Sequence, residues 1–354
     1  MNIKQSIIII LLIIGSSSMG LLVMEFIVRA LNIPPVPLDP IPIPSYQLSE
    51  NPILGYEYRQ NYNPSDIPFD ISHKGHATNS EGFRDYEYNV DKPEELYRTL
   101  ILGDSTTAGN GITSLDKIYS KQLEKLLNKN SNTNIRHEVL NLGVGGYHTL
   151  QEVETLRTKG IKYKPDLVIL TFCLNDFDLN SDGGVYETLL KNNPTALEAT
   201  LFSFSYTLLR YSRLAFILHH SLQTHDTDYT SWYTQNILKN KTPVEVGLTL
   251  LSALQLDYEF TAYVLILPAF THYFHDYRFK PIHKNVIKIT DKLSGITTID
   301  LLSHFSNIDL NATKFSYDGV HLNEYGHKTM AEILLPIVET NCQIALSRKH
   351  KNIE

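Results

Sequence analysis

The sequence has few cysteines and no concentrated charge, and each shortage excludes a class of protein. Two cysteines, Cys173 and Cys342, are too few for a disulfide scaffold, and they do not form a zinc-type CxxC pair. Lysine and arginine form no run of five, and the formal net charge is −7, which argues against a general nucleic-acid-binding protein. The GxGxxG and Walker spacings of phosphate-binding loops are absent. The hydrophobic fraction of 42% is that of a globular protein rather than a disordered one.

The N-terminal region contains an uncharged, strongly apolar run from Ser6 to Met24. That length is sufficient to cross a bilayer as a helix, and Lys4 before it predicts that the bulk of the chain lies outside the cytoplasm. We therefore expect a single-pass membrane anchor over residues 1–29. A cleaved signal peptide is the main alternative, because the small residues from Gly15 to Ser18 resemble a cleavage site. A buried core helix is a weaker alternative, since the run is uniformly apolar rather than amphipathic.

Residues 30–50 are rich in proline, with Pro37, Pro40, Pro42 and Pro44 at short intervals. Proline fixes φ and lacks a backbone N–H, so this segment is neither helix nor central strand. We expect an extended, semi-rigid stalk that connects the anchor to the globular part. A proline-rich ligand for a partner domain is the alternative.

Five short apolar segments predict strands, and helical patterns separate them. The predicted strands are Arg98–Leu102, His137–Leu142, Asp166–Phe172, Tyr263–Pro268 and Ile296–Leu301. Alternation of strand and helix predicts a parallel sheet that helices cover on both faces. In such a sheet the ligand site lies beyond the carboxyl ends of the strands. Predicted helices include one that follows Ser114, one over Leu150–Lys159 and a final one capped by Asn323.

Four short motifs follow the ends of these predicted strands. They are Gly103-Asp104-Ser105, the run from Asn141 to Gly146, Asn175-Asp176, and Asp318-Gly319-Val320-His321. Each motif alone consists of residue types that are common in ordinary turns. Together they supply a nucleophile, oxyanion donors and a base with an orienting acid, which are the parts that acyl transfer through a serine ester requires. We expect Asp104 and Asp176 to fix loops through side-chain to backbone hydrogen bonds.

On these residues the sequence resembles the SGNH (GDSL-type) hydrolase superfamily, and in particular its membrane-anchored bacterial members. The run from Gly103 to Gly109 resembles the first block of that superfamily, and Asp318 with His321 resembles the DxxH block. The resemblance implies a flavodoxin-like, three-layer α/β/α fold with a five-stranded parallel sheet. Upstream segments, Leu54-Gly55-Tyr56 and Asn79 to Asp85, also resemble those of anchored members. In one departure, Cys173 stands where the third block usually begins with glycine.

The resemblance and the chemistry assign the same roles. Ser105 is the expected nucleophile, His321 the base that takes its proton, and Asp318 the acid that orients the imidazole. The expected oxyanion donors are the backbone N–H groups of Ser105 and Gly146 and the side-chain amide of Asn175. No metal or organic cofactor is implied. The GxSxG signature is absent, which disfavours the α/β-hydrolase fold.

The sequence therefore predicts a serine esterase or acyl hydrolase over residues 51–345, with acylated glycans or lipids among its candidate substrates. An O-acyltransferase that modifies a polysaccharide is one alternative, because the first half-reaction uses the same residues. A non-catalytic glycan-binding module on the same scaffold is another. We interpret residues 180–244 as a helical insertion, either a lid or acyl pocket or a plain spacer, and residues 346–354 as a polar tail.

Overall fold

The computed structural model describes residues 3–31, 45–63, 77–130, 134–178, 185–190, 212–215, 217, 229–271 and 273–351. The chain divides into two compact units, residues 1–40 with 193–227, and residues 41–192 with 228–354. The second unit contains every residue predicted for the site. Most of the expected proline-rich stalk, and much of the expected insertion over residues 180–244, lie outside the described residues.

A five-stranded parallel sheet forms the centre of the second unit, which confirms the predicted fold class. Its strands are β3 (Leu96–Leu102), β4 (Arg136–Asn141), β5 (Leu167–Phe172), β6 (Thr261–Ile266) and β7 (Ile296–Asp300). Their order is β4-β3-β5-β6-β7, and every neighbouring pair is parallel. This is the flavodoxin-like order, in which the chain reverses direction across the sheet between its first and third strands. The reversal lies between β3 and β5.

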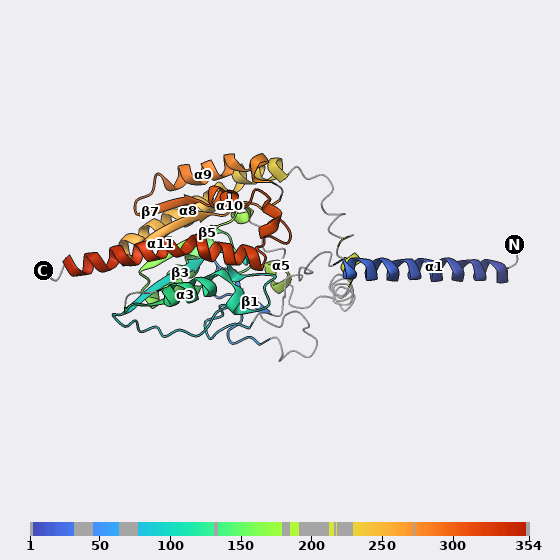
Figure 1. The fold of residues 1–354 in the computed structure, drawn as a ribbon, viewed down its shortest axis with the longest axis horizontal. Helices are drawn as coiled ribbons and strands as arrows, with labels where there is room; N and C mark the ends of the chain where they lie inside the picture. The colour runs from blue at the N-terminus through green and yellow to red at the C-terminus, as the bar shows by residue number, and fades with distance from the viewer. Residues whose placement is uncertain are drawn as a thin grey trace. The chain divides into compact units, whose positions relative to one another are not determined.

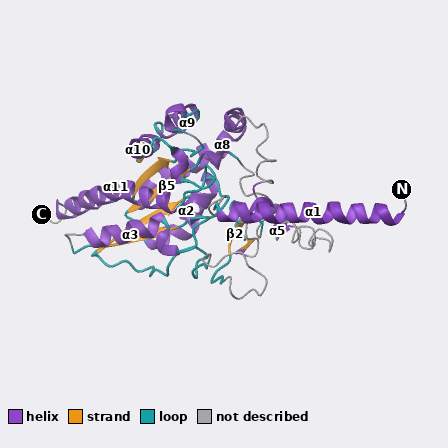
Figure 2. Ribbon diagram, turned by 45° about the vertical axis from the view of Figure 1, so that its right-hand side comes forward, coloured by secondary structure: helices purple, strands orange, loops and turns teal. Residues whose placement is uncertain are grey.

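Helices cover the sheet on both faces, as Figures 1 and 2 show. Helix α3 (Tyr119–Asn130) packs against α11 (Glu324–Lys351), while α4 (Thr149–Thr155) packs against α8 (Tyr229–Tyr258), which also contacts α9 (Lys280–Thr290). Every residue of β3 and β5 is buried, as expected for strands between two helical layers. The register places Leu102 of β3 opposite Leu170 of β5 and Ile101 opposite Asn141 of β4, so these strands end at a similar level.

The local sequence explains several helix ends. The Asn323 side chain accepts the Gly326 N–H at 2.9 Å, which confirms the predicted cap of α11. The helix expected directly after Ser114 begins only at Tyr119, because the Ser114 hydroxyl donates to the Asp116 carboxylate and caps nothing. A 3₁₀ turn fills the gap.

The remaining helices and turns are α2 (Ser105–Ala108), α5 (Val185–Leu190), α10 (Leu302–Ile308), a π-type turn at Leu156–Gly160, and 3₁₀ turns at Leu115–Lys117, Ile161–Tyr163, Leu174–Phe177, Phe274–Asp276 and Ala312–Phe315.

An antiparallel hairpin precedes the sheet and was not predicted from the sequence. Strand β1 (Tyr46–Leu48) pairs with β2 (Tyr56–Tyr58), and β1 begins inside the range assigned to the stalk. Three tyrosines of the hairpin are buried, namely Tyr46, Tyr56 and Tyr58. A segment with such a core belongs to the globular unit rather than to a spacer.

The N-terminal run forms the first helix, α1 (Ile3–Ala30). The expected transmembrane helix is not found, because no helix among the residues the structure describes is sufficiently long and apolar to span a bilayer. Small and polar residues from Gly15 to Ser18 interrupt the apolar sequence of α1. Near its end, Arg29 pairs with Glu25 at 2.6 Å.

Candidate active site

The predicted nucleophile lies at the carboxyl end of β3, where the strand order reverses. Ser105 opens the short helix α2, and the Asp104 carboxylate caps that helix by accepting the Thr106 N–H at 2.8 Å. The first N–H groups of a helix have no partner within the helix, so they point outward at this edge. The local sequence therefore presents both the hydroxyl and the backbone N–H of Ser105 at the expected position for a ligand.

The structure brings the three predicted catalytic side chains into direct contact. The Ser105 Oγ and His321 Nε2 atoms lie 2.9 Å apart, and His321 Nδ1 lies 2.8 Å from Asp318 Oδ2. The other carboxylate oxygen of Asp318 accepts the backbone N–H groups of Val320 and His321, at 3.0 and 2.8 Å. A single loop thus supplies the histidine and the acid with fixed mutual geometry.

The charges of Asp318 and His321 favour the role of His321 as a general base. Burial alone would raise the pKa of Asp318, but the His321 charge and three hydrogen bonds outweigh it and lower that pKa to about 2. Burial also opposes protonation of His321, but the charge of Asp318 and its hydrogen bond raise the His321 pKa above its ordinary value. A carboxylate that stays ionised beside an imidazole fixes its tautomer and stabilises the imidazolium during proton transfer.

The three predicted oxyanion donors come from the ends of three adjacent strands. Gly146 lies on the turn after β4 with a φ of +80°, a conformation that favours glycine. Asn175 is the second residue of the turn after β5, and its amide Nδ2 donates to Asp104 Oδ2 at 2.8 Å. The turn after β4 is connected to the serine helix, because the Asn141 amide donates to the Thr107 carbonyl at 2.9 Å.

Buried carboxyl groups lie behind these loops. Asp176 accepts the Thr149 hydroxyl at 2.6 Å and the Cys173 N–H at 3.3 Å, so it fixes the loop as predicted. Glu152 was not singled out in the sequence, yet it is fully buried and neither of its oxygens has a partner among the described residues. Burial, with the charge of neighbouring carboxylates, raises the pKa of both Asp176 and Glu152 well above the ordinary range. Both are therefore expected to favour the neutral form.

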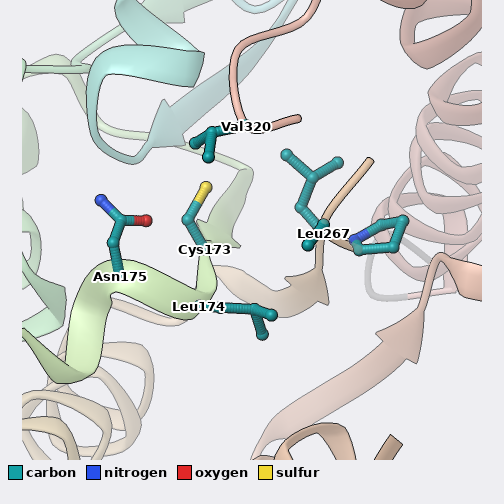
Figure 3. Close-up of a pocket in the computed structure, with 7 residues that line it drawn as sticks. Cys173, Leu174, Asn175, Leu267 and Val320 are labelled. Atoms are coloured by element: carbon teal, nitrogen blue, oxygen red, sulfur yellow. The ribbon is translucent and has the colours of Figure 1, made fainter. Parts of the chain in front are cut away.

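A small pocket of about 20 Å³ lies beside Asn175, the predicted side-chain oxyanion donor. Its lining is mostly apolar and consists of Cys173, Leu174, Asn175, Leu267, Pro268, Ala269 and Val320. Figure 3 shows the Cys173 sulfur pointing toward Val320, with the Asn175 amide beside it. The same sulfur lies 3.5 Å from Asp104 Oδ1 and 3.7 Å from the Thr106 hydroxyl, which flank Ser105 in the sequence. The predicted oxyanion donor Asn175 thus lines the pocket, and the Cys173 wall of the pocket contacts the residues on either side of Ser105.

Sequence reasoning missed the residues that support the serine helix from upstream. The buried Arg84 guanidinium donates to the carbonyl oxygens of Ala108, Gly109 and Ile112, at and beyond the end of α2. Burial lowers the Arg84 pKa to about 10, so the side chain stays charged at neutral pH. A cation at the carbonyl end of a helix stabilises it. The segment from Asn79 to Asp85 resembles that of anchored family members, but this resemblance assigned no role to Arg84.

No group of three or more histidine, cysteine, aspartate or glutamate side chains in the described ranges could hold a metal ion. The chemistry described above needs only the side chains and backbone groups present.

A serine, histidine and aspartate in this contact, at the carboxyl edge of a flavodoxin-like sheet, have the geometry of a serine hydrolase. Residues 101–329 match the family model described as the GDSL-like Lipase/Acylhydrolase family. The match covers more than half of the chain, so the chain belongs to this family and is a hydrolase that acts on ester bonds, as predicted. Comparison with curated proteins found no match.

Several solved structures are similar to this chain. The acetyl xylan esterase AlAXEase is 15% identical, with a TM-score of 0.41, and the match covers 68% of this chain and 99% of that one. A mutant of Axe2, an acetyl-xylooligosaccharide esterase from Geobacillus Stearmophilus, is 16% identical, with a TM-score of 0.42 and coverage of 68% and 94%. LAE5, an alpha/beta hydrolase from the metagenome of Lake Arreo, Spain, is 14% identical, with a TM-score of 0.41 and coverage of 69% and 95%. Membership of the family depends on the family model.

Proposed function

We propose that the protein is a serine esterase that releases short acyl groups, of about acetyl size, through an acyl-Ser105 intermediate. The observation that carries the proposal is the continuous contact from Ser105 Oγ to His321 Nε2, at 2.9 Å, and from His321 Nδ1 to Asp318 Oδ2, at 2.8 Å. A serine hydroxyl is a poor nucleophile until a base at this distance accepts its proton.

The reaction follows from these positions. The Ser105 oxygen attacks the ester carbonyl while His321 takes its proton, and the oxyanion receives hydrogen bonds from the N–H groups of Ser105 and Gly146 and the amide of Asn175. The alcohol then leaves with the proton held by His321. Water attacks the acyl-serine, His321 takes the proton of the water, and collapse of the second oxyanion releases the carboxylic acid and the free serine.

The size of the pocket supports a short acyl group. A volume of about 20 Å³ holds one or two water-sized groups, which matches a methyl group rather than a fatty-acyl chain. Its apolar lining, with the Asn175 amide at one side, suits an acyl tail next to its carbonyl oxygen. Acetyl esters, including those of glycans, are therefore the substrates we propose first, and long-chain lipids the last.

We also propose that the catalytic unit acts outside the cytoplasm. The support is the uncharged run from Ser6 to Met24, preceded by Lys4. This location does not require a spanning helix, because a signal peptide, the alternative interpretation of the same run, would have the same consequence. Fractionation of cells that express the full chain tests the proposal, and recovery of all activity in the cytoplasmic fraction would contradict it.

A fluorophosphonate probe tests the proposed nucleophile. Fluorophosphonates form a stable adduct with an activated serine, so we expect labelling of Ser105 in the native protein and none in Ser105→Ala or His321→Ala. Hydrolysis of p-nitrophenyl acetate should exceed that of the butyrate and octanoate. An added sugar acceptor distinguishes hydrolase from acyltransferase, since transfer would yield an acylated sugar in place of free acetate. A folded native protein without a labelled serine would overturn the esterase proposal and favour a binding module.

A further inference from the structure

The β1–β2 hairpin lies next to the turn that carries Gly146. Its tyrosines form a buried cluster in which the Tyr46 and Tyr58 rings stack, with centroids 4.6 Å apart, and Tyr56 packs edge-on against Tyr46 at 5.5 Å. This hairpin (β1 is labelled in Figure 1, β2 in Figure 2) precedes residues 101–329, the part of the chain that matches the family model. The hairpin therefore lies outside the part of the chain that the family model describes.

The three hydroxyl groups of the hairpin converge on one backbone residue, Gly145. The Tyr56 hydroxyl donates to the Gly145 carbonyl at 2.9 Å. The Tyr46 hydroxyl lies 3.5 Å from the same oxygen and 3.2 Å from the Tyr58 hydroxyl, which is its shorter bond. The Gly145 N–H donates to the Tyr58 hydroxyl at 3.2 Å. A Cβ atom at Gly145 would lie 2.5 Å from the Tyr46 hydroxyl, so the close approach requires glycine. Both hydrogen-bonding groups of this residue are thus held by side chains almost a hundred residues away in the sequence.

The carbonyl of Gly145 and the N–H of Gly146 belong to the same peptide group. That group is planar and its N–H points away from its carbonyl, so a bond that fixes the carbonyl also fixes the direction of the N–H. A hydrogen bond to the carbonyl polarises the amide, which makes its N–H a stronger donor. A group that bonds to the Gly145 carbonyl therefore controls both the direction and the hydrogen-bonding strength of the Gly146 N–H, the proposed oxyanion donor.

We propose that Tyr56 is a positioning residue that orients and polarises the Gly146 oxyanion donor through the Gly145 carbonyl, with Tyr46 and Tyr58 completing the grip. This inference rests on the proposed function, because it assigns the hairpin to the same oxyanion site. The Tyr56 backbone is itself held, since the Tyr147 hydroxyl donates to the Tyr56 carbonyl. The Tyr56 and Tyr147 rings also meet edge-on at 5.2 Å.

The test compares two single-hydroxyl deletions. Tyr56→Phe removes the bond to the Gly145 carbonyl, whereas Tyr263→Phe removes a hydroxyl on β6 that accepts the Asn341 amide at 3.1 Å, away from the Gly145 peptide. For Tyr56→Phe we expect kcat on p-nitrophenyl acetate to fall about 10- to 100-fold with KM nearly unchanged, less than the roughly 100- to 1,000-fold typical for loss of a whole oxyanion donor. The rate of fluorophosphonate labelling should fall by the same factor. Tyr263→Phe should lower the Tm without a comparable loss of kcat.

A purely structural role for Tyr56 would give a different pattern. The losses of activity in both variants would then follow their losses in Tm, or Tyr56→Phe would keep a kcat within about twofold of the parent, and either result would overturn the inference. The pH dependence of kcat/KM should be unchanged in Tyr56→Phe, because the histidine and its acid are untouched. Failure of the native protein to label at Ser105 would instead remove the proposed function itself, so the two failures are distinguishable.

Discussion

The side-chain amide of Asn175 donates a hydrogen bond to Asp104, with 2.8 Å between Nδ2 and Oδ2. The other oxygen of the same carboxylate accepts the Thr106 N–H and caps the helix that begins with Ser105. Asp104 therefore connects the loop of the nucleophile to the loop of a proposed oxyanion donor. The sequence predicts that Asp104 fixes its own turn, and the structure shows that it also holds the neighbouring one.

Replacement of this carboxylate should reduce turnover more than substrate binding. In Asp104→Ala the Asn175 amide loses its partner and α2 loses its cap, so we expect at least a tenfold fall in kcat and about 1 kcal/mol lower stability. Steady-state kinetics and urea unfolding measure the two effects. Asn175→Ala provides the matched comparison. If the double variant is slower than the parent by the full product of the two single effects, Asp104 does not act through Asn175 and this interpretation is wrong.

The pH dependence of the reaction should report the raised pKa of His321. The neutral imidazole is the base, so kcat/KM rises with pH through this pKa, and the acid limb should lie above the ordinary value of 6.5. In Asp318→Asn the carboxylate charge is lost, which moves the limb to lower pH and decreases the maximal rate by as much as about 10⁴-fold. Initial rates in buffers of constant ionic strength test this. A limb that stays in place in Asp318→Asn would show that another group titrates.

The acyl preference should depend on Cys173. Its sulfur occupies the pocket, so Cys173→Gly should enlarge it and raise the rate on p-nitrophenyl butyrate relative to the acetate, by about tenfold for the 1–3 kcal/mol that a methylene contributes in such a pocket. Cys173→Ser is the matched control, because it keeps the volume, and its preference for acetate should stay unchanged. An identical change of preference in both variants would mean that pocket volume does not select the acyl group.

Removal of one partner from the buried ion pair between Lys121 and Asp85 should be strongly destabilising. Lys121 Nζ lies 2.6 Å from Asp85 Oδ1, and both side chains are 2% exposed. Lys121→Met leaves the carboxylate uncompensated, which should cost about 3–5 kcal/mol at neutral pH. Removal of the exposed Lys328, 3.8 Å from Glu332, should cost less than about 1 kcal/mol. Urea unfolding of both variants measures the difference, and equal losses would refute this argument.

The pair of Lys121 and Asp85 also determines how the destabilisation of Lys121→Met should vary with pH. Burial raises the Asp85 pKa from 3.8 to about 6 despite the Lys121 charge, so the folded protein binds this proton more readily than the unfolded chain does. The contribution of Asp85 is therefore most favourable at low pH and declines as the pH rises toward 6. Without Lys121 the Asp85 pKa should rise further, so the decline should extend to higher pH. The destabilisation of Lys121→Met should therefore be smaller at pH 5 than at pH 8.

The fold was largely predictable because its central strands, β3 and β5, are short, mostly apolar runs that are buried on both faces. The predicted strand Arg98–Leu102 and the observed β3 share an end, since Gly103 terminates the run. The candidate site was predictable for a related reason. Ser105, Asn175 and the loop of His321 follow strand ends, and parallel strands bring those ends to one edge.

What could not be predicted depends on contacts between distant segments. The role of Tyr56 arises from a carbonyl 89 residues further along the chain, and that of Arg84 from carbonyls beyond the end of α2. Neither residue belongs to a periodic pattern that marks a core or a site. The transmembrane anchor predicted over residues 1–29 was not found, since no helix among the described residues is sufficiently long and apolar to span a bilayer.

Arg84 and the hairpin tyrosines, which precede β3 in the sequence, also affect where the enzyme can be truncated. A fragment that starts at β3, near the first residue matched by the family model, would retain every catalytic atom in its sequence. It would lack Arg84 and the three hairpin tyrosines. It would therefore lack the side chains that bond to the serine helix and to the Gly145 peptide. Domain borders taken from homology would, for this chain, separate the reacting groups from the scaffold that aims them.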